Sequence, residues 1–237
     1  MKHFLAFITA LVSLTATAQQ KNSSSTLLGL SFSPDHSFRT LVYHSGDAPT
    51  DLVIKSRNDN ELAKFGYTAG LNVYFKCSRR VGFETGIQYA NKGYQTKEQQ
   101  LVYAPPDNTL PSTQKINYTY QYIGIPLKLK LHFGTGQLQF NTGLGFVTSI
   151  LLNAKENITY GYLNGTSQKK SSSSTSGFKK LDFSPVISAG VNYQLNNKLQ
   201  LFAEPSFRYN VLKTKDASIS EHLWSAGLNV GFYCSVR

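Results

Sequence analysis

The sequence has few cysteines and, after its first 18 residues, no long apolar run. Only Cys77 and Cys234 occur in 237 residues, and a chain of this length does not need a disulfide framework. No later stretch approaches the ~20 apolar residues that a membrane-spanning helix requires. A location in a membrane would therefore require a closed barrel, because lipid leaves unpaired backbone groups unsatisfied.

Motifs that mark an active site are also missing. The sequence contains no Gly-x-Ser-x-Gly elbow, no phosphate loop and no His/Cys cluster with metal-ligand spacing. The five histidines are scattered, and only His132 takes an inward position on a predicted strand. We interpret it as a hydrogen-bonding residue inside the fold, near its periplasmic end. We predict no catalytic residue, no metal ligand and no cofactor, and the sequence identifies no binding residue.

Acidic residues are scarce relative to basic ones. The chain has 24 Lys and Arg against 13 Asp and Glu, which gives a formal net charge of +11. The basic residues form no dense stripe, and an exported protein rarely meets DNA, so no nucleic-acid partner is expected. This excess of basic residues indicates one of two things. Either it forms a basic surface that faces an anionic partner, such as lipid phosphates, or it only keeps long loops soluble.

The N-terminal segment has the features of a cleavable signal peptide. Lys2 and His3 precede an apolar run over Phe4–Leu14, and the small residues Ala16 and Ala18 fit a signal-peptidase site. We predict a signal peptide over residues 1–18 and a single barrel domain over residues 19–237. No other helix is expected in the chain.

The mature chain repeats one pattern, in which apolar residues alternate with polar or small ones. Phe65–Cys77 is a clear example, and period-2 alternation is typical of a β-strand with two different surroundings. The same pattern recurs in Val81–Tyr89, Ile123–Phe133, Leu138–Leu152, Pro185–Leu195, Leu199–Tyr209 and Trp224–Val236, with a weaker instance in Thr26–Ser33. These segments predict an all-β fold: an eight-stranded antiparallel up-and-down transmembrane β-barrel.

The composition of the two strand faces distinguishes a membrane barrel from a soluble one. The polar face carries many glycines and several charges, which suit the narrow lumen of an eight-stranded membrane barrel. A structural network of paired charges is predicted there, because an unpaired buried charge is costly. Its members are Glu84, Lys128, Lys130, Glu204 and Arg208. The apolar face should contact lipid through Leu71, Val73, Ile125, Leu127, Leu129, Leu144, Phe146, Val191, Leu228 and Val230.

The connections between predicted strands alternate in length. Three are short: Ser78–Arg80, Gly134–Gly136 and Asn196–Lys198. The others are the long segments Pro34–Lys64, Gln95–Asn117, Asn153–Phe183 and Asn210–Leu223. The serine-rich stretch Ser171–Ser174, with Thr175, Ser176 and Gly177, is expected to be mobile. Outer-membrane barrels have short periplasmic turns and long extracellular loops. We therefore predict the bacterial outer membrane, with periplasmic termini and extracellular loops.

With the strands placed, the chain resembles the PorT-like small outer-membrane β-barrel family of Bacteroidetes. Tyr122–Lys130 is similar to the family's aromatic-x-x-Ile-Pro-Leu-x-Leu-Lys strand, and Asn141–Phe146 to the Gly-rich strand that follows. Val186–Tyr193 is similar to a later Gly-x-Gly-Val strand, although Ser188 stands where the family often has Gly. The resemblance covers the mature chain and implies a location and a fold, without a shared reaction.

These observations favour a non-enzymatic envelope protein with a structural, binding or accessory role. Two alternatives stay open: a lipid-modifying outer-membrane enzyme, and a narrow pore or secretion-accessory component. The expected partners are outer-membrane lipid and, through the loops, envelope proteins or an extracellular ligand. We expect a monomer.

Overall fold

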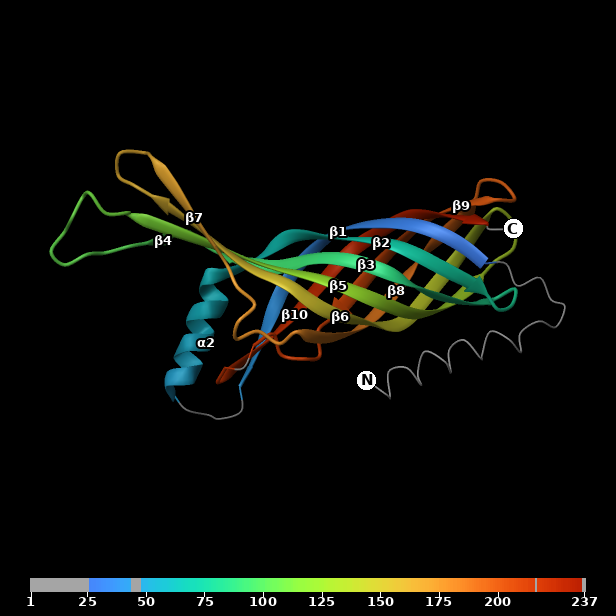
Figure 1. The fold of residues 1–237 in the computed structure, drawn as a ribbon, viewed down its shortest axis with the longest axis horizontal. Helices are drawn as coiled ribbons and strands as arrows, with labels where there is room; N and C mark the ends of the chain where they lie inside the picture. The colour runs from blue at the N-terminus through green and yellow to red at the C-terminus, as the bar shows by residue number, and fades with distance from the viewer. Residues whose placement is uncertain (1–25, 44–47, 216, 236–237) are drawn as a thin grey trace.

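A computed structural model describes residues 26–43, 48–215 and 217–235, and within them eight strands close into a ring (Figure 1). Each strand pairs antiparallel with its neighbour along the ring, and the last strand pairs with the first. This confirms the predicted all-β, eight-stranded up-and-down barrel. The proposed signal peptide lies outside the described residues. The ring consists of β1 (Thr26–Tyr43), β2 (Glu61–Lys76), β3 (Val81–Thr96), β5 (Thr113–Phe133), β6 (Leu138–Gly161), β8 (Leu181–Gln194), β9 (Leu199–Tyr209) and β10 (Ile219–Ser235).

The two faces of the wall follow the predicted alternation. Apolar side chains point outward, as at Leu71 and Leu144, which are 62% and 65% exposed. All ten residues predicted to face lipid are exposed or half-buried on the outer face. The inward positions hold small, polar and charged side chains, among them the fully buried Glu204. The interior is therefore a polar lumen filled by side chains.

One end of the barrel, here called the turn end, carries the three short connections, over residues 77–80, 134–137 and 195–198. The start of β1 and the end of β10 also meet there, because Leu27 pairs with Ser235. The opposite end is called the loop end. It carries the helix α2 (Ala48–Asn60) and two extra strands, β4 (Gln99–Gln100) on β5 and β7 (Ser167–Ser173) on β6. Together with the ends of β5 and β6 these two strands form an arm that projects from the barrel (Figure 1).

The structure corrects several predicted boundaries at the loop end. β6 runs to Gly161 and not to Leu152, and β1 runs to Tyr43 and not to Ser33. The serine-rich stretch, expected to be mobile, contributes Ser171–Ser173 to β7, where Ser171 pairs with Asn157. The physical reason is that backbone pairing continues beyond the membrane, where water removes the requirement for apolar alternation.

The expectation of no further helix was also wrong, because α2 occupies 13 residues of a predicted loop. Its aliphatic residues Leu52, Val53 and Ile54 are consecutive and so do not line one face, which leaves no amphipathic signal. It is held by side-chain contacts with the barrel. Within the described part of the chain, no helix has the length and apolar character needed to cross a bilayer; this bears only on helices.

Candidate functional site

Four of the five predicted charges meet inside the barrel near the turn end. Glu84 on β3 lies directly opposite Lys128 on β5 and forms an ion pair with it. Lys130 Nζ lies 2.7 Å from Glu84 Oε2 and 2.6 Å from Glu204 Oε1, and so joins β3 to β9 across the lumen. The side chains of Glu84, Lys130 and Glu204 are at most 1% exposed. We call these four residues the lumen ion cluster.

Aromatic side chains complete this cluster. Lys130 Nζ donates to Tyr233 Oη at 3.1 Å and lies 5.2 Å from the ring centre of Phe202, which stacks on Tyr233. The Tyr233 hydroxyl in turn donates to Glu84. Tyr74 fits beside them because Gly82 has no side chain; a Cβ there would lie 1.8 Å from Tyr74 Oη. Charge, hydrogen bonds and packing together fill this level of the lumen.

The fifth predicted charge, Arg208, lies in a different cluster. Its Nη1 atom is 3.3 Å from Asp35 Oδ2 on β1. Asp35 also accepts hydrogen bonds from Thr68 at 2.5 Å and from Ser33 at 2.6 Å. The single network drawn through all five residues therefore needs correction. Arg208 follows Glu204 by four positions on β9, which separates their levels by about 13 Å along the strand.

A third cluster closes the loop end and attaches α2 to the barrel. Arg57 of α2 contacts Glu61 at 2.6 Å and Glu221 at 3.0 Å. Glu61 also pairs with Arg39 of β1 at 2.6 Å, and Tyr94 donates to Glu221 at 3.0 Å. Burial disfavours the charged form of Arg57, but the hydrogen bonds and charges of Glu61 and Glu221 outweigh it and raise its pKa. The cation is therefore permanent.

The sequence analysis did not identify the residues of this third cluster, nor Asp35. The signal for Asp35 and Arg39 was present: Ser33, Asp35, Ser37 and Arg39 all share one phase, and all are buried. The prediction ended the first strand at Ser33, before the proline that follows. No comparable signal marks Glu221, because its partners come from distant segments.

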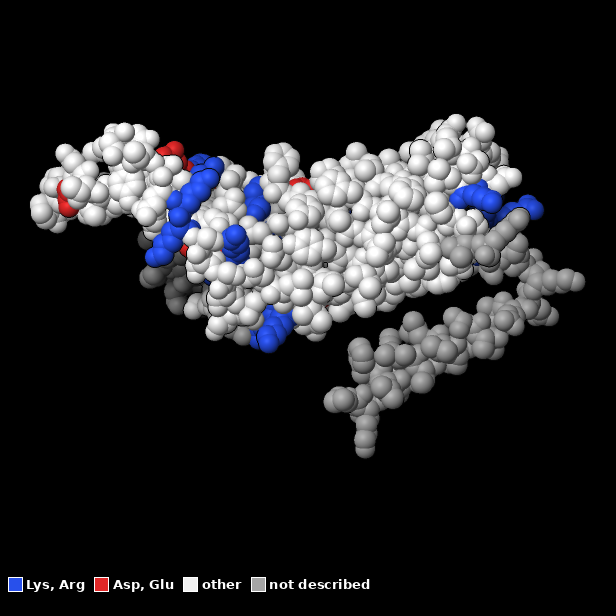
Figure 2. Space-filling model, turned by 45° about the horizontal axis from the view of Figure 1, so that its top comes forward, with Lys and Arg blue, Asp and Glu red and all other residues white. Residues whose placement is uncertain are grey.

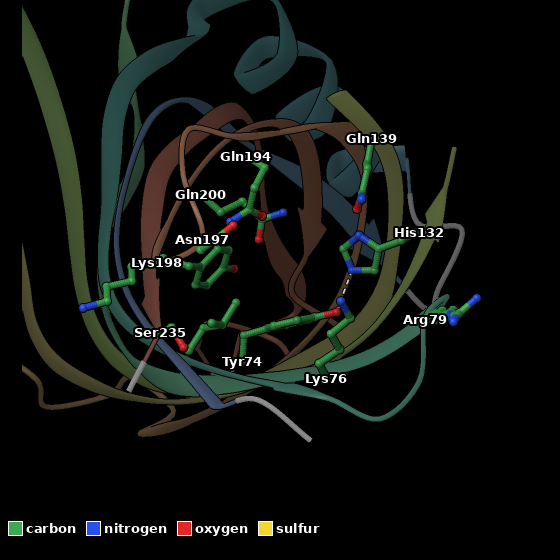
Figure 3. A pocket seen from close by; sticks show the side chains of 12 residues that line it. Tyr74, Lys76, Arg79, His132, Gln139, Gln194, Asn197, Lys198, Gln200 and Ser235 are labelled. Carbon is green, nitrogen blue, oxygen red and sulfur yellow. Dashed lines mark hydrogen bonds between the residues drawn. The ribbon is translucent and has the colours of Figure 1, made fainter. Parts of the chain in front are cut away.

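The turn end opens into a polar cavity of about 280 Å³ around His132 (Figure 3). His132 Nε2 lies 2.6 Å from Tyr74 Oη, and its Nδ1 lies 3.1 Å from Asn192 Nδ2. The side chain lies where the sequence placed it, as a half-buried hydrogen-bonding residue near this end. The charged ends of Arg79 and Lys198 point away from the centre of the cavity (Figure 3). This geometry is structural, because both ring nitrogens are engaged by the wall.

Among the described residues, no group of three or more His, Cys, Asp or Glu side chains is placed to hold a metal ion. Cys77 and Cys234 are both exposed free thiols. Cys77 directly follows β2 and Cys234 lies on β10, and β1 lies between these two strands, which separates them by about 10 Å from the usual strand spacing.

A closed ring with an apolar outer face and a charged, filled lumen defines a membrane-spanning β-barrel. The chain belongs to the family described as outer membrane protein beta-barrel domain, whose model matches residues 18–216. The protein is therefore an outer-membrane β-barrel.

Solved structures of other bacterial barrels are similar to this chain. Neisserial surface protein A is 11% identical over 91% of this chain and 100% of its own, with a TM-score of 0.45. Ail, the attachment invasion locus protein of Yersinia pestis, is 12% identical over 90% and 99%, with a TM-score of 0.36. The outer membrane protease OmpT of Escherichia coli is 8% identical over 92% and 99%, with a TM-score of 0.32. No curated protein matches the chain.

Proposed function

We propose that this protein is a non-enzymatic, non-conducting barrel that acts in the envelope through its loop end. In this proposal the turn end and both termini face the periplasm, and α2 and the arm face the exterior. The resemblance of Tyr122–Lys130 to the PorT-like strand supports a structural, binding or accessory role of the kind expected for envelope barrels of Bacteroidetes. The long connections gather at one end, and exposed loops on a rigid scaffold commonly carry binding.

The observation that carries this proposal is the filled lumen. Three charge clusters lie at successive levels, from Lys130 near the turn end, through Arg208 in the middle, to Arg57 at the loop end. Ions would have to displace buried, paired charges, whose separation in a poorly hydrated interior is costly. This arrangement supports a closed barrel over a narrow pore.

Planar-bilayer recordings test this proposal. The wild-type barrel should give no steady openings. The matched control replaces Glu84, Lys128, Lys130 and Glu204 together by Ala, which removes two acids and two bases and so leaves net charge unchanged. This variant should also stay closed, because the Arg208 and Arg57 clusters still block the lumen at two other levels. Steady conductance of the wild type would contradict the proposal.

The enzyme alternative gains no support from the loop end. A lipid-modifying enzyme would need a nucleophile or a base at this rim. Among the histidines that the structure describes, His222 is the candidate base near the rim. Its Nδ1 lies 3.1 Å from the Asn210 carbonyl oxygen, and its ring stacks on Tyr209. That geometry anchors the imidazole to the wall and favours a structural role. Unchanged lipid A masses after gene deletion would agree with this.

A further inference from the structure

A basic cleft of about 560 Å³ lies at the loop end, on the outer face of the strands. Its floor is made by outward-facing residues of β3, β5, β6 and β7, such as Gln95, Asn117 and Asn157. Lys64, Lys115, Lys169 and Lys170 line it, and none of the described lining residues is acidic. Figure 2 shows Lys and Arg gathered at the base of the arm, whereas the adjoining barrel wall is nearly free of charge.

Lys64 is the buried cation of this cleft. It is 9% exposed, and its Nζ donates to Thr119 Oγ1 at 2.6 Å, Asn117 Oδ1 at 2.9 Å and the Tyr118 carbonyl at 3.3 Å. These partners are neutral, so the charge has no counter-ion among them. Gly93 of β3 lies beside these partners and has no side chain; a Cβ there would lie 2.0 Å from the Tyr118 carbonyl oxygen. A buried cation without a paired anion is costly, which favours an anion bound in the cleft.

Exposed lysines provide the groups that could contact such an anion. All three Lys64 protons already point to protein oxygens, so Lys64 contributes charge. Lys115 and Lys169 are exposed, and Lys155 on β6 lies directly opposite Thr119. The cleft therefore combines one fixed charge with several mobile donors, a combination that suits phosphate oxygens.

The position of the cleft bears on where such an anion would come from. Thr119 lies on the same outward face of β5 as the exposed Ile123, four residues away. Four residues span about 13 Å along the strand. The distance along the membrane normal is shorter, because the strands of a barrel are tilted. Phe65, next to Lys64, is 84% exposed, and Tyr67 is 38% exposed on the same face. Aromatic residues of this kind mark the bilayer interface. The cleft therefore begins at the level where lipid headgroups lie.

We propose that this cleft binds the phosphate of a membrane lipid headgroup in the leaflet at the loop end. The lipid-facing orientation favours a membrane lipid over a soluble anion. The proposal applies to either leaflet, so it is independent of the orientation and of the closed lumen proposed above. Each lysine near a membrane surface contributes about 1 kcal/mol of attraction, which corresponds to about a fivefold change in affinity.

Native mass spectrometry of the folded barrel in detergent tests the site, with phosphatidylglycerol and phosphatidylcholine of equal acyl chains as probes. The wild type should retain phosphatidylglycerol preferentially. Lys115→Gln with Lys169→Gln, which changes two exposed side chains, should weaken that retention about fivefold per lysine. Lys64→Gln alone should weaken it as well, with folding checked by heat-modifiable gel mobility.

The matched control is Lys76→Gln with Lys198→Gln, which removes two exposed lysines at the turn end and should leave retention unchanged. Equal losses in the two double variants would reject a specific site. Unchanged retention in the Lys115 and Lys169 variant would reject it too. Displacement of the lipid by millimolar inorganic phosphate would assign the cleft to a soluble anion and overturn the lipid assignment.

Discussion

At the scale of the residue, the stability of the lumen ion cluster depends on which acid pairs with which base. Lys128 contacts Glu84, whereas Lys130 is shared between Glu84 and Glu204. Removal of Glu84 would leave Lys128 without an acid but leave Lys130 with Glu204. Breaking a buried pair costs more than replacing both partners, because the single change leaves one charge uncompensated.

Glu84→Gln should therefore lower the free energy of unfolding in lipid vesicles by about 3–5 kcal/mol. Adding Lys128→Met should restore at least half of that loss. Urea titration followed by tryptophan fluorescence measures both. The exposed Glu98→Gln, on the arm, is the matched control and should change little. Additive losses in the double variant would show that the two residues are not energetically coupled.

At the scale of the element, α2 is held by charge and not by an apolar face. Its position depends on Arg57, which reaches Glu61 and Glu221 and also donates to Tyr94 at 3.1 Å. Exposed Leu52, 70% accessible, makes little contribution to docking. A helix of 13 residues with this composition is marginal alone, so its order rests on these contacts.

Arg57→Ala should therefore loosen α2 and leave the barrel intact. Hydrogen bonds to charged groups contribute about 1.5–3 kcal/mol, so amide exchange in α2 should accelerate at least ~10-fold. Hydrogen–deuterium exchange mass spectrometry reads this directly. Lys55→Ala, at an exposed position of the same helix, should leave exchange close to wild type. Equal exchange in the two variants would mean that the arginine does not hold the helix.

At the scale of the whole molecule, the two ends differ in a way that tests orientation. Cys77 is exposed in a turn-end connection, and Leu163 is 68% exposed at the far end of the β6–β7 hairpin. If the turn end is periplasmic, a membrane-impermeant maleimide should not label wild-type cells. It should label Leu163→Cys in intact cells, and the native cysteines only after permeabilisation. Labelling of intact wild-type cells would reverse the assignment.

The sequence by itself determined the barrel. The alternation in Phe65–Cys77 and in the other predicted strands fixes which face of each strand is apolar. Because successive side chains point to opposite faces, the pattern also fixes which side chains point into the barrel. The inward phase of Glu84, Lys130 and Glu204 followed from it.

Tertiary structure alone decided which inward charges form ion pairs, and which secondary structure the chain adopts beyond the membrane. Phase places a side chain inside the lumen but does not give its height or its partner across the ring. Arg208 therefore pairs with Asp35 of β1 and not within the cluster of Glu204. Beyond the bilayer, the extended strands and α2 are stabilised by backbone pairing and by ion pairs between distant segments. Such contacts leave no local period in the sequence, because each partner is supplied by the closed fold.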